Sequence, residues 1–314
     1  MTLPVTPRTL VKGILSLALP SQRMTRTRNR DAAYFYSAFL RQLVTCAAAG
    51  APPRLGAVGE LGPGTALGMG LAALLAGAGR YVALDVAPYA SLAENEAVLD
   101  ALVALFRARA PIPGDDAYPN LKPRLTDYAF PHALLPEPHL EAALAPGRIE
   151  ALRQSLRTGH GRITYVAPWD DPAVVEPASL DWIFSQAVLE HVDDVPQAYG
   201  AIATWLRPGG LTSHQIDLRS HGTAVTWNGH WACPDWLWAL AEGKRYYLIN
   251  RAPASAHLEA LRSVGLEIVE ARRLRGETGG IGRDRLALRF RSMSDEDLTT
   301  SGIYLIGRRP VPAA

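Results

Sequence analysis

Cysteine is scarce in this sequence of 314 residues, which also has no long apolar run and no large excess of one charge. Its two cysteines, Cys46 and Cys233, are far apart and lack metal-binding spacing, which argues against a disulfide framework and fits a reducing compartment. No uninterrupted apolar run reaches the roughly 18–20 residues of a membrane-spanning helix. The apolar stretch 10–19 carries Lys12 and lacks a clear cleavage site, so we interpret it as an amphipathic helix rather than a signal peptide. We therefore expect a cytoplasmic protein with no membrane partner.

The charges nearly cancel, because 32 basic residues face 30 acidic ones and the formal net charge is +2. A protein that captures nucleic acid electrostatically is usually more basic, so we expect no nucleic-acid partner. Lysine is the scarce cation: only Lys12, Lys122 and Lys244 occur, and all other basic residues are arginine. We attribute this bias to GC-rich coding. We interpret the arginine runs at 23–30 and 272–275 as solvated faces.

The sequence does contain enough apolar material for a core, since 48% of residues are hydrophobic and 20% are charged. Short apolar segments that favour strands alternate with helical ones from residue 54 onward. Such alternation predicts an α/β fold whose mostly parallel sheet is covered by helices on both faces. The expected strands are a first one ending at Glu60, then 80–85, 163–166, 182–185, 211–216, 266–271 and 302–307.

Three zones follow from these patterns. Residues 1–50 are predicted to form an N-terminal helical cap, in which Asn29 or Asp31 caps a helix over 31–49. Residues 51–314 are predicted to form the main domain. Within it, about 107–160 is rich in proline, which excludes a long helix or a central strand. We interpret this segment as an insertion of loops and short helices, ending in a helix near 148–156, that acts as a lid.

The strongest local motif is the glycine-rich turn that follows the first strand. Glu60, Gly62 and Gly64 are followed by a helix over 67–75. Glycines at a strand–helix turn let the backbone approach a ligand, and the helix N-terminus adds N–H donors. An acidic residue before the first glycine would repel a pyrophosphate and suits a ligand with a positive amino group.

A nicotinamide-dependent oxidoreductase is the main alternative. The dinucleotide pattern fails from Gly62, because its third position is Leu67. A looser form fits Gly68, Gly70 and Ala73, although these residues fall inside the expected helix. Asp85, at the end of the second strand, could accept both hydroxyls of a ribose.

Polar residues also follow the strand at 182–185 and the strand at 211–216. Ser185, Gln186, Glu190 and His191 lie beyond the first of these strands, where a parallel sheet places its ligands. The segment 206–210, Leu-Arg-Pro-Gly-Gly, ends a helix and leads into the next strand, which finishes at Asp217.

The set of Glu60-x-Gly62-x-Gly64, Asp85, Leu189-Glu-His-Val192 and Leu206-Arg-Pro-Gly-Gly210 resembles the class I S-adenosylmethionine-dependent methyltransferases. The order and spacing agree over roughly 54–309, apart from the insertion. The resemblance implies a Rossmann-like seven-stranded sheet whose last strand is antiparallel. It also implies S-adenosylmethionine as cofactor.

Site residues follow from the resemblance by position. Glu60 would hold the methionine amino group through nearby groups, the 62–64 backbone would face the methionine and ribose, and Asp85 would bind the ribose hydroxyls. Asp170 would hold the adenine amino group, with Trp169 stacking on the ring. The remaining cofactor contacts are expected from neighbours in the same turns, Thr65, Val86, Gln186 and Ala187.

Methyl transfer needs an aligned nucleophile, and a hydroxyl acceptor also needs a general base. The candidates are His191, His214, Asp217 and His221, of which we favour Asp217 and His221 near the acceptor. His191 is as readily architectural as catalytic, and His214 could be a core histidine. We expect a small-molecule acceptor with a hydroxyl, because bases are present and 185–188 lacks the Asn/Asp-Pro-Pro-Tyr/Phe signature that marks nitrogen methylation in this family.

Other interpretations stay open at this stage. His214, His221 and Asp217, with two further aspartates at 193 and 194, could bind a divalent metal, but their spacing is not diagnostic and we predict no metal site. The fold could also belong to an inactive binding protein. The helices in 8–49 could cover the active site or pair two subunits into a homodimer.

Overall fold

The computed structural model describes residues 3–18, 31–90, 92–245, 248–276 and 278–312. The arginine run at 23–30 therefore lies outside the described residues. The strands are β1 (Ala57–Leu61), β2 (Arg80–Leu84), β3 (Ile163–Val166), β4 (Leu180–Gln186), β5 (Leu206–Asp217), β6 (Glu267–Arg275) and β7 (Thr300–Arg308). All seven expected strands are confirmed, and the main difference is that β5 begins five residues earlier than expected.

These strands form one sheet in the order β3-β2-β1-β4-β5-β7-β6. The first five in that order are parallel, and β7 runs antiparallel to both β5 and β6. This confirms the mostly parallel seven-stranded sheet and its antiparallel last strand. The register aligns Leu61 with Leu84 and with Ser185, so the ends of β1, β2 and β4 meet at one edge of the sheet. Loops from that edge carry most of the expected site.

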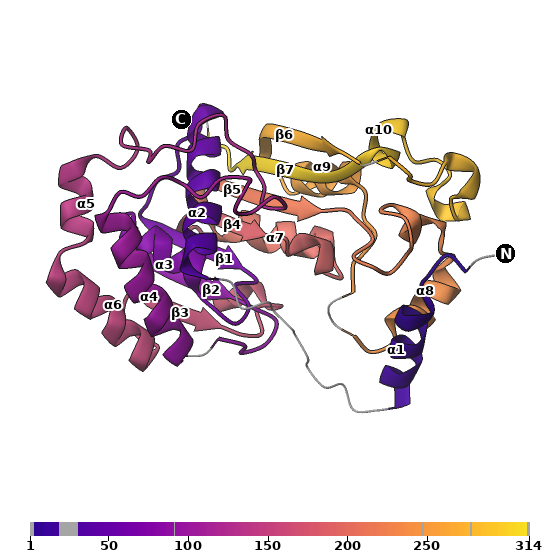
Figure 1. The fold of residues 1–314 in the computed structure, drawn as a ribbon, viewed down its shortest axis with the longest axis horizontal. Coiled ribbons are helices and arrows are strands. Elements are labelled where there is room, and N and C mark those ends of the chain that lie inside the picture. The colour runs from indigo at the N-terminus through magenta and orange to yellow at the C-terminus, as the bar shows by residue number, and fades with distance from the viewer. Residues whose placement is uncertain (1–2, 19–30, 91, 246–247, 277, 313–314) are drawn as a thin grey trace.

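Helices cover both faces of the sheet (Figure 1). The longer ones are α1 (Pro7–Ala18), α2 (Ala32–Ala48), α3 (Gly68–Leu75), α4 (Leu92–Arg107), α5 (Glu137–Ala143), α6 (Pro146–Thr158), α7 (Val195–Trp205), α8 (Asp235–Glu242) and α9 (Ala254–Ser263). Alternate side chains of β4 face opposite layers, as a strand requires. Trp182 and Phe184 pack under α2 and α3, whereas Ile183 packs with α7 and α9.

The N-terminal segment does not form a single cap. Helix α2 belongs to the main core, where Phe35 and Phe39 are buried, and Asp31 caps its N-terminus by accepting a hydrogen bond from Tyr34 N at 2.8 Å. Helix α1 instead packs against α8, with Gly13 close to the backbone of α8. Figure 1 shows α1 and α2 at different ends of the molecule. The expected cap over 1–50 is thus two helices with separate packing partners.

The proline-rich insertion is ordered and packs against the core. It contains α5 and α6, and α6 confirms the helix expected near 148–156. Arg41 of α2 is fully buried beneath the insertion and donates hydrogen bonds to the carbonyl oxygens of Pro113, Leu121 and Pro123. Its guanidinium also lies 2.9 Å from Asp115 Oδ1. One buried arginine therefore fixes the loop that covers the sheet edge.

Within the described part of the chain, none of the helices has the length and apolar composition needed to cross a bilayer.

Candidate active site

The turn after β1 requires glycine at two positions. Gly62 and Gly64 have φ angles of 63° and 72°, in the left-handed region that a side chain disfavours. A Cβ on Gly62 would also lie 2.7 Å from the side chain of Val188, and Gly62 N donates to Leu84 O at 2.7 Å. Thr65 follows directly in the same turn. The bare backbone of this turn gives close access to a ligand, as the methionine and ribose of the expected cofactor need.

Asp85 lies just beyond β2 and faces the same turn. Its Oδ2 accepts a hydrogen bond from Gly64 N at 2.8 Å, and its Oδ1 accepts one from Val86 N at 2.7 Å. Burial raises the pKa of Asp85, and these backbone hydrogen bonds oppose the increase. Each carboxylate oxygen keeps acceptor capacity for one ribose hydroxyl. The neighbouring Val86 is half exposed, so an apolar surface lies next to the carboxylate.

Glu60 is buried beneath the turn rather than open to it. Its Oε2 accepts hydrogen bonds from Tyr81 Oη at 2.6 Å and from Gly70 N at 3.1 Å. Any contact of Glu60 with the amino group of the methionine would therefore pass through intervening groups, as the resemblance implies.

The second glycine pattern, Gly68-x-Gly70, has a packing role. A Cβ on Gly68 would lie 2.1 Å from the ring of Phe35, and a Cβ on Gly70 would lie 2.0 Å from the ring of Tyr81. Both glycines are buried inside α3. The absence of a side chain at these two positions leaves room for two aromatic rings. This packing explains the glycine pattern without a bound dinucleotide.

At the end of β4, a chain of amides links the sheet to the insertion. Gln186 Nε2 donates to Gln215 Oε1 at 2.9 Å and to the carbonyl oxygen of Lys122 at 3.2 Å. Gln186 Oε1 accepts from Gln42 Nε2 of α2 at 3.2 Å. The next residue, Ala187, has a φ of 57°, an uncommon conformation for alanine that redirects the chain at the sheet edge.

The expected adenine contacts differ in their exposure. Trp169 is buried, with its ring 6.1 Å from that of Trp205 and nearly perpendicular to it. Asp170 is exposed, and its carbonyl oxygen accepts a hydrogen bond from Gln197 Nε2 at 3.2 Å. The packing of Trp169 into the α7 layer leaves little of its ring exposed, and both residues remain predicted contacts.

A cavity of about 980 Å³ opens at the carboxyl edge of β4 and β5. Its walls come from the start of α2, the 117–124 part of the insertion, the loop after β5, and the facing ends of β6 and β7. Gln186, Ala187, His191, Asp217 and His221 all line it, which brings together predicted residues from β4 and β5. The cavity is large enough for a small organic acceptor.

Asp217 and His221 form a pair inside this cavity, where His221 Nε2 lies 3.3 Å from Asp217 Oδ2. Arg219 also donates to Asp217, from Nη2 at 2.6 Å and from Nε at 2.9 Å. Burial alone would raise the pKa of Asp217, but the hydrogen bonds from Arg219 and His221 outweigh it and hold that pKa well below its usual range. His221 has a φ of 48°, so the loop holds it in a strained conformation.

His191 lies beside this pair, with its ring centroid 5.2 Å from that of His221. It belongs to the short helical turn Leu189–His191. Asn250 holds that turn, because its Nδ2 donates to Leu189 O at 2.7 Å and to Val192 O at 2.8 Å. Asn250 is thus a positioning residue for His191.

His214 does not line the cavity, so the expectation that it is a catalytic residue is not supported. It is fully buried in β5, with Nδ1 2.8 Å from Ser185 Oγ and Nε2 2.5 Å from Thr212 Oγ1. Burial, together with the nearby His257, lowers the pKa of His214 to about 3. Since both ring nitrogens have partners in the core, His214 is a structural histidine.

Sequence reasoning missed the residues that the insertion and α2 contribute to the cavity. Tyr118 Oη donates to Asp31 Oδ1 at 2.6 Å, and the rings of Tyr118 and Tyr34 meet edge to face with centroids 5.4 Å apart. Lys122 lines the same wall. The only signals were the predicted cap at Asp31 and the aromatic residues among the prolines, and neither indicates a shared cavity.

Among the residues that the structure describes, no cluster of three or more His, Cys, Asp or Glu side chains is arranged to hold a metal ion.

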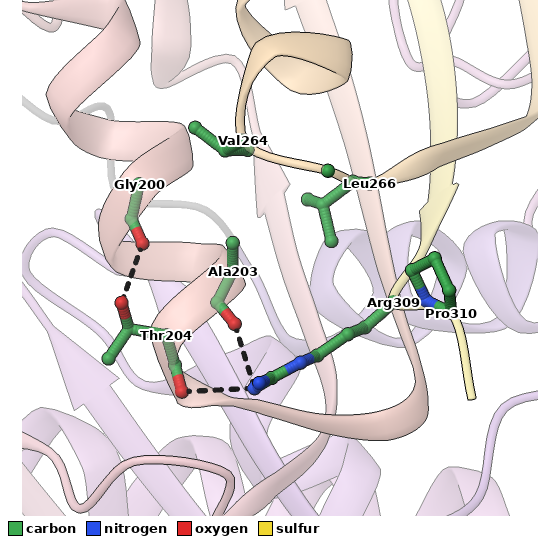
Figure 2. A pocket seen from close by; sticks show the side chains of 8 residues that line it. Gly200, Ala203, Thr204, Val264, Leu266, Arg309 and Pro310 are labelled. Atoms are coloured by element: carbon green, nitrogen blue, oxygen red, sulfur yellow. Dashed lines mark hydrogen bonds between the residues drawn. The ribbon is translucent and has the colours of Figure 1, made fainter. Parts of the chain in front are cut away.

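A second hollow, of about 330 Å³, lies at the opposite edge of the sheet (Figure 2). Arg309 reaches across it and donates to the carbonyl oxygens of Ala203 at 3.0 Å and Thr204 at 3.4 Å. These carbonyls belong to the last turn of α7, so Arg309 caps that helix. We assign this hollow a structural role.

A family model described as a methyltransferase domain matches residues 144–213, from α6 into β5. No curated protein matches the chain. The matched stretch, together with the seven-stranded sheet and its antiparallel β7, agrees with the resemblance to the class I S-adenosylmethionine-dependent methyltransferases. Both observations support an enzyme that uses S-adenosylmethionine as its cofactor.

Among the solved structures with a similar backbone fold are the following three methyltransferases. One is a protein assigned as a sarcosine dimethylglycine methyltransferase from Galdieria sulphuraria, 12% identical over 88% of this chain and 86% of that one, with a TM-score of 0.44. Another is an S-adenosylmethionine-dependent methyltransferase from Mesorhizobium loti, 15% identical over 82% and 93%, with a TM-score of 0.40. The third is phosphoethanolamine N-methyltransferase 2 from Haemonchus contortus in complex with S-adenosyl-L-methionine, 13% identical over 91% and 58%, with a TM-score of 0.39.

Proposed function

We propose that this methyltransferase acts on a hydroxyl oxygen of a small molecule and that His221 is the general base. The observation that carries the proposal is the Asp217–His221 pair, 3.3 Å apart, in the wall of the cavity next to Ala187. A hydroxyl is a weak nucleophile until a base takes its proton, and an imidazole is suited to that task near neutral pH.

The residues present fit the cofactor. The 62–64 backbone would face the methionine and ribose, Asp85 would accept the ribose hydroxyls, and Val86 would offer an apolar surface beside them. Thr65, Gln186, Ala187 and Asp170 remain proposed contacts. When bound, the cofactor would supply a sulfonium methyl group for in-line attack by the nucleophile, with S-adenosylhomocysteine as the leaving group.

The roles of the chain's own residues follow from the hydrogen bonds. Asp217 would hold His221 by accepting from its Nε2, which leaves Nδ1 to take the proton of the acceptor hydroxyl as the new carbon–oxygen bond forms. Arg219 keeps Asp217 ionised and fixed in position. His191 would complete the wall beside the acceptor.

The test is a mass-spectrometric screen of hydroxylated metabolites with methyl-labelled S-adenosylmethionine, followed by NMR of any product. The proposal predicts an O-methyl product whose formation depends on His221. A product methylated on nitrogen or carbon, or a His221→Gln variant with the full rate, would overturn it.

We also propose a cytoplasmic setting. The support is that both cysteines, Cys46 and Cys233, are free thiols buried in the fold, as in proteins of reducing compartments.

A further inference from the structure

The wall that the insertion contributes to the cavity carries an unbalanced positive charge. Lys122, one of the few lysines of the chain, lines the cavity and is half buried. Its ammonium donates to Pro119 O at 3.1 Å, and among the described residues no carboxylate lies within ion-pair distance of it. A partly buried ammonium with one neutral acceptor has donors left for a ligand.

The charges around Lys122 do not compensate it. Asp115, the carboxylate of this wall, is shared between the buried Arg41 at 2.9 Å and Arg124 at 3.2 Å. Burial lowers the pKa of Lys122, and the positive charges of Arg124, Arg41 and Arg219 lower it further, although the charge of Asp115 opposes them. Asp115 thus forms ion pairs with two guanidiniums and none with the ammonium of Lys122.

The acidic side chains that line the cavity are occupied elsewhere. Asp31 accepts from Tyr118 Oη and from Tyr34 N, and Asp217 accepts from Arg219 and His221. Neither of these two carboxylates forms an ion pair with Lys122.

We infer that Lys122 and Arg124 bind an anionic group of the acceptor, a carboxylate or a phosphate, in the cavity that also contains the Asp217–His221 pair. Both groups offer oxygens that a lysine or arginine binds through charge-assisted hydrogen bonds. The hydrogen bond from Gln186 Nε2 to the carbonyl oxygen of Lys122 fixes this wall to the end of β4. The assignment of the anion to the acceptor rests on the proposed function, whereas the anion site itself does not.

Lysine labelling tests the site without turnover. The full-length protein with S-adenosylhomocysteine is treated with an amine-acetylating reagent, and the rate at each lysine is measured by peptide mass spectrometry. Inorganic phosphate and citrate are the probes, and sodium chloride at the same ionic strength controls for screening. Lys12 and Lys244 are exposed and serve as references in the same sample.

A bound anion slows labelling by the factor 1 + [L]/Kd, about elevenfold at ten times Kd. We expect this slowing at Lys122 alone, by phosphate or by citrate, and the more effective probe identifies the chemistry. An Arg124→Gln variant should lose most of the protection, whereas Arg157→Gln, which breaks an exposed ion pair between α6 and α4, should keep it. Equal labelling of Lys122 in phosphate, citrate and chloride would overturn the anion site. Protection without any hydroxyl methylation would instead leave the anion site standing and remove only the proposed function.

Discussion

His221 Nε2 lies 3.3 Å from Asp217 Oδ2, at the point where the chain leaves β5 and enters the cavity. The pair spans one tight loop, and Arg219 between them donates to the same carboxylate. This arrangement fixes the imidazole from one side and leaves its other nitrogen for a ligand.

Replacing His221 by Gln is expected to slow methyl transfer by about 10²–10⁴-fold, because a general base contributes about that much. Affinity for S-adenosylhomocysteine should not change, since the cofactor residues follow β1 and β2. Initial rates and calorimetric titration measure the two effects separately. His160→Gln, at an exposed histidine before β3, is the matched control. Equal rates in the two variants would remove His221 from the reaction.

The hydrogen bonds from Arg41 to the insertion predict that loss of this side chain destabilises the insertion locally. Arg41→Met would leave the carbonyl oxygens of Pro113, Leu121 and Pro123 without a buried donor, so we expect a loss of about 3 kcal/mol of unfolding free energy. Amide exchange should increase in 113–124 before it increases in the sheet. The control Arg157→Met breaks an exposed pair and should cost at most about 1 kcal/mol. Unchanged exchange in the insertion would contradict this role of Arg41.

A substitution at Gly70 tests whether this glycine has a packing role rather than a role in cofactor binding. Gly70→Ala would push a Cβ into the ring of Tyr81, so we expect a destabilisation of about 1–3 kcal/mol. Thermal and urea unfolding measure it. Gly147→Ala in α6 meets nothing within 4 Å and should not destabilise the protein. If the Gly70→Ala variant had the stability of the wild type, the close packing of Gly70 against the ring of Tyr81 would be contradicted.

Buried histidines predict acid sensitivity. Burial lowers the pKa of His214 and His230 to about 3 and that of His257 to about 4. An unfolded histidine titrates near 6.5, so between about pH 6.5 and 4 the unfolded state binds protons that the folded state does not. The unfolding free energy should therefore fall as the pH falls, by about 1 kcal/mol per pH unit for each histidine.

Urea unfolding as a function of pH tests this slope. His257→Leu removes one of the three groups and should make the decline between pH 6.5 and 4 shallower, whereas His160→Leu, at the exposed histidine, should leave it unchanged. Parallel curves for the wild type and His257→Leu would show that His257 does not stay neutral in the fold.

Much of the fold could be predicted because its signals are local. The glycine turn, the alternation of strands and helices, and the cap at Asp31 each depend on a few neighbouring residues. His214 shows the limit of this reasoning. Its place in a strand was evident, but whether it faced the core or the cavity depended on Ser185 and Thr212, which lie on the same sheet and meet it only after folding.

The residues of the cavity wall could not be predicted from the sequence for a similar reason. Lys122 and Arg124 come from a loop without regular structure, and Arg41 holds that loop from a helix about 80 positions earlier in the chain. Trp169 is predicted to stack on adenine, and its packing against Trp205 leaves little of its ring exposed. These contacts depend on packing between residues far apart in the sequence, and no short motif predicts them.

Calorimetric titration with S-adenosylhomocysteine tests the cofactor site most directly, with Asp85→Ala and NAD as comparisons. Binding at micromolar ligand, weakened strongly by Asp85→Ala and absent with NAD, is the predicted result, because Asp85 accepts hydrogen bonds from the turn and would accept the ribose hydroxyls. No binding at millimolar ligand by the folded protein, or binding of NAD instead, would contradict the assignment.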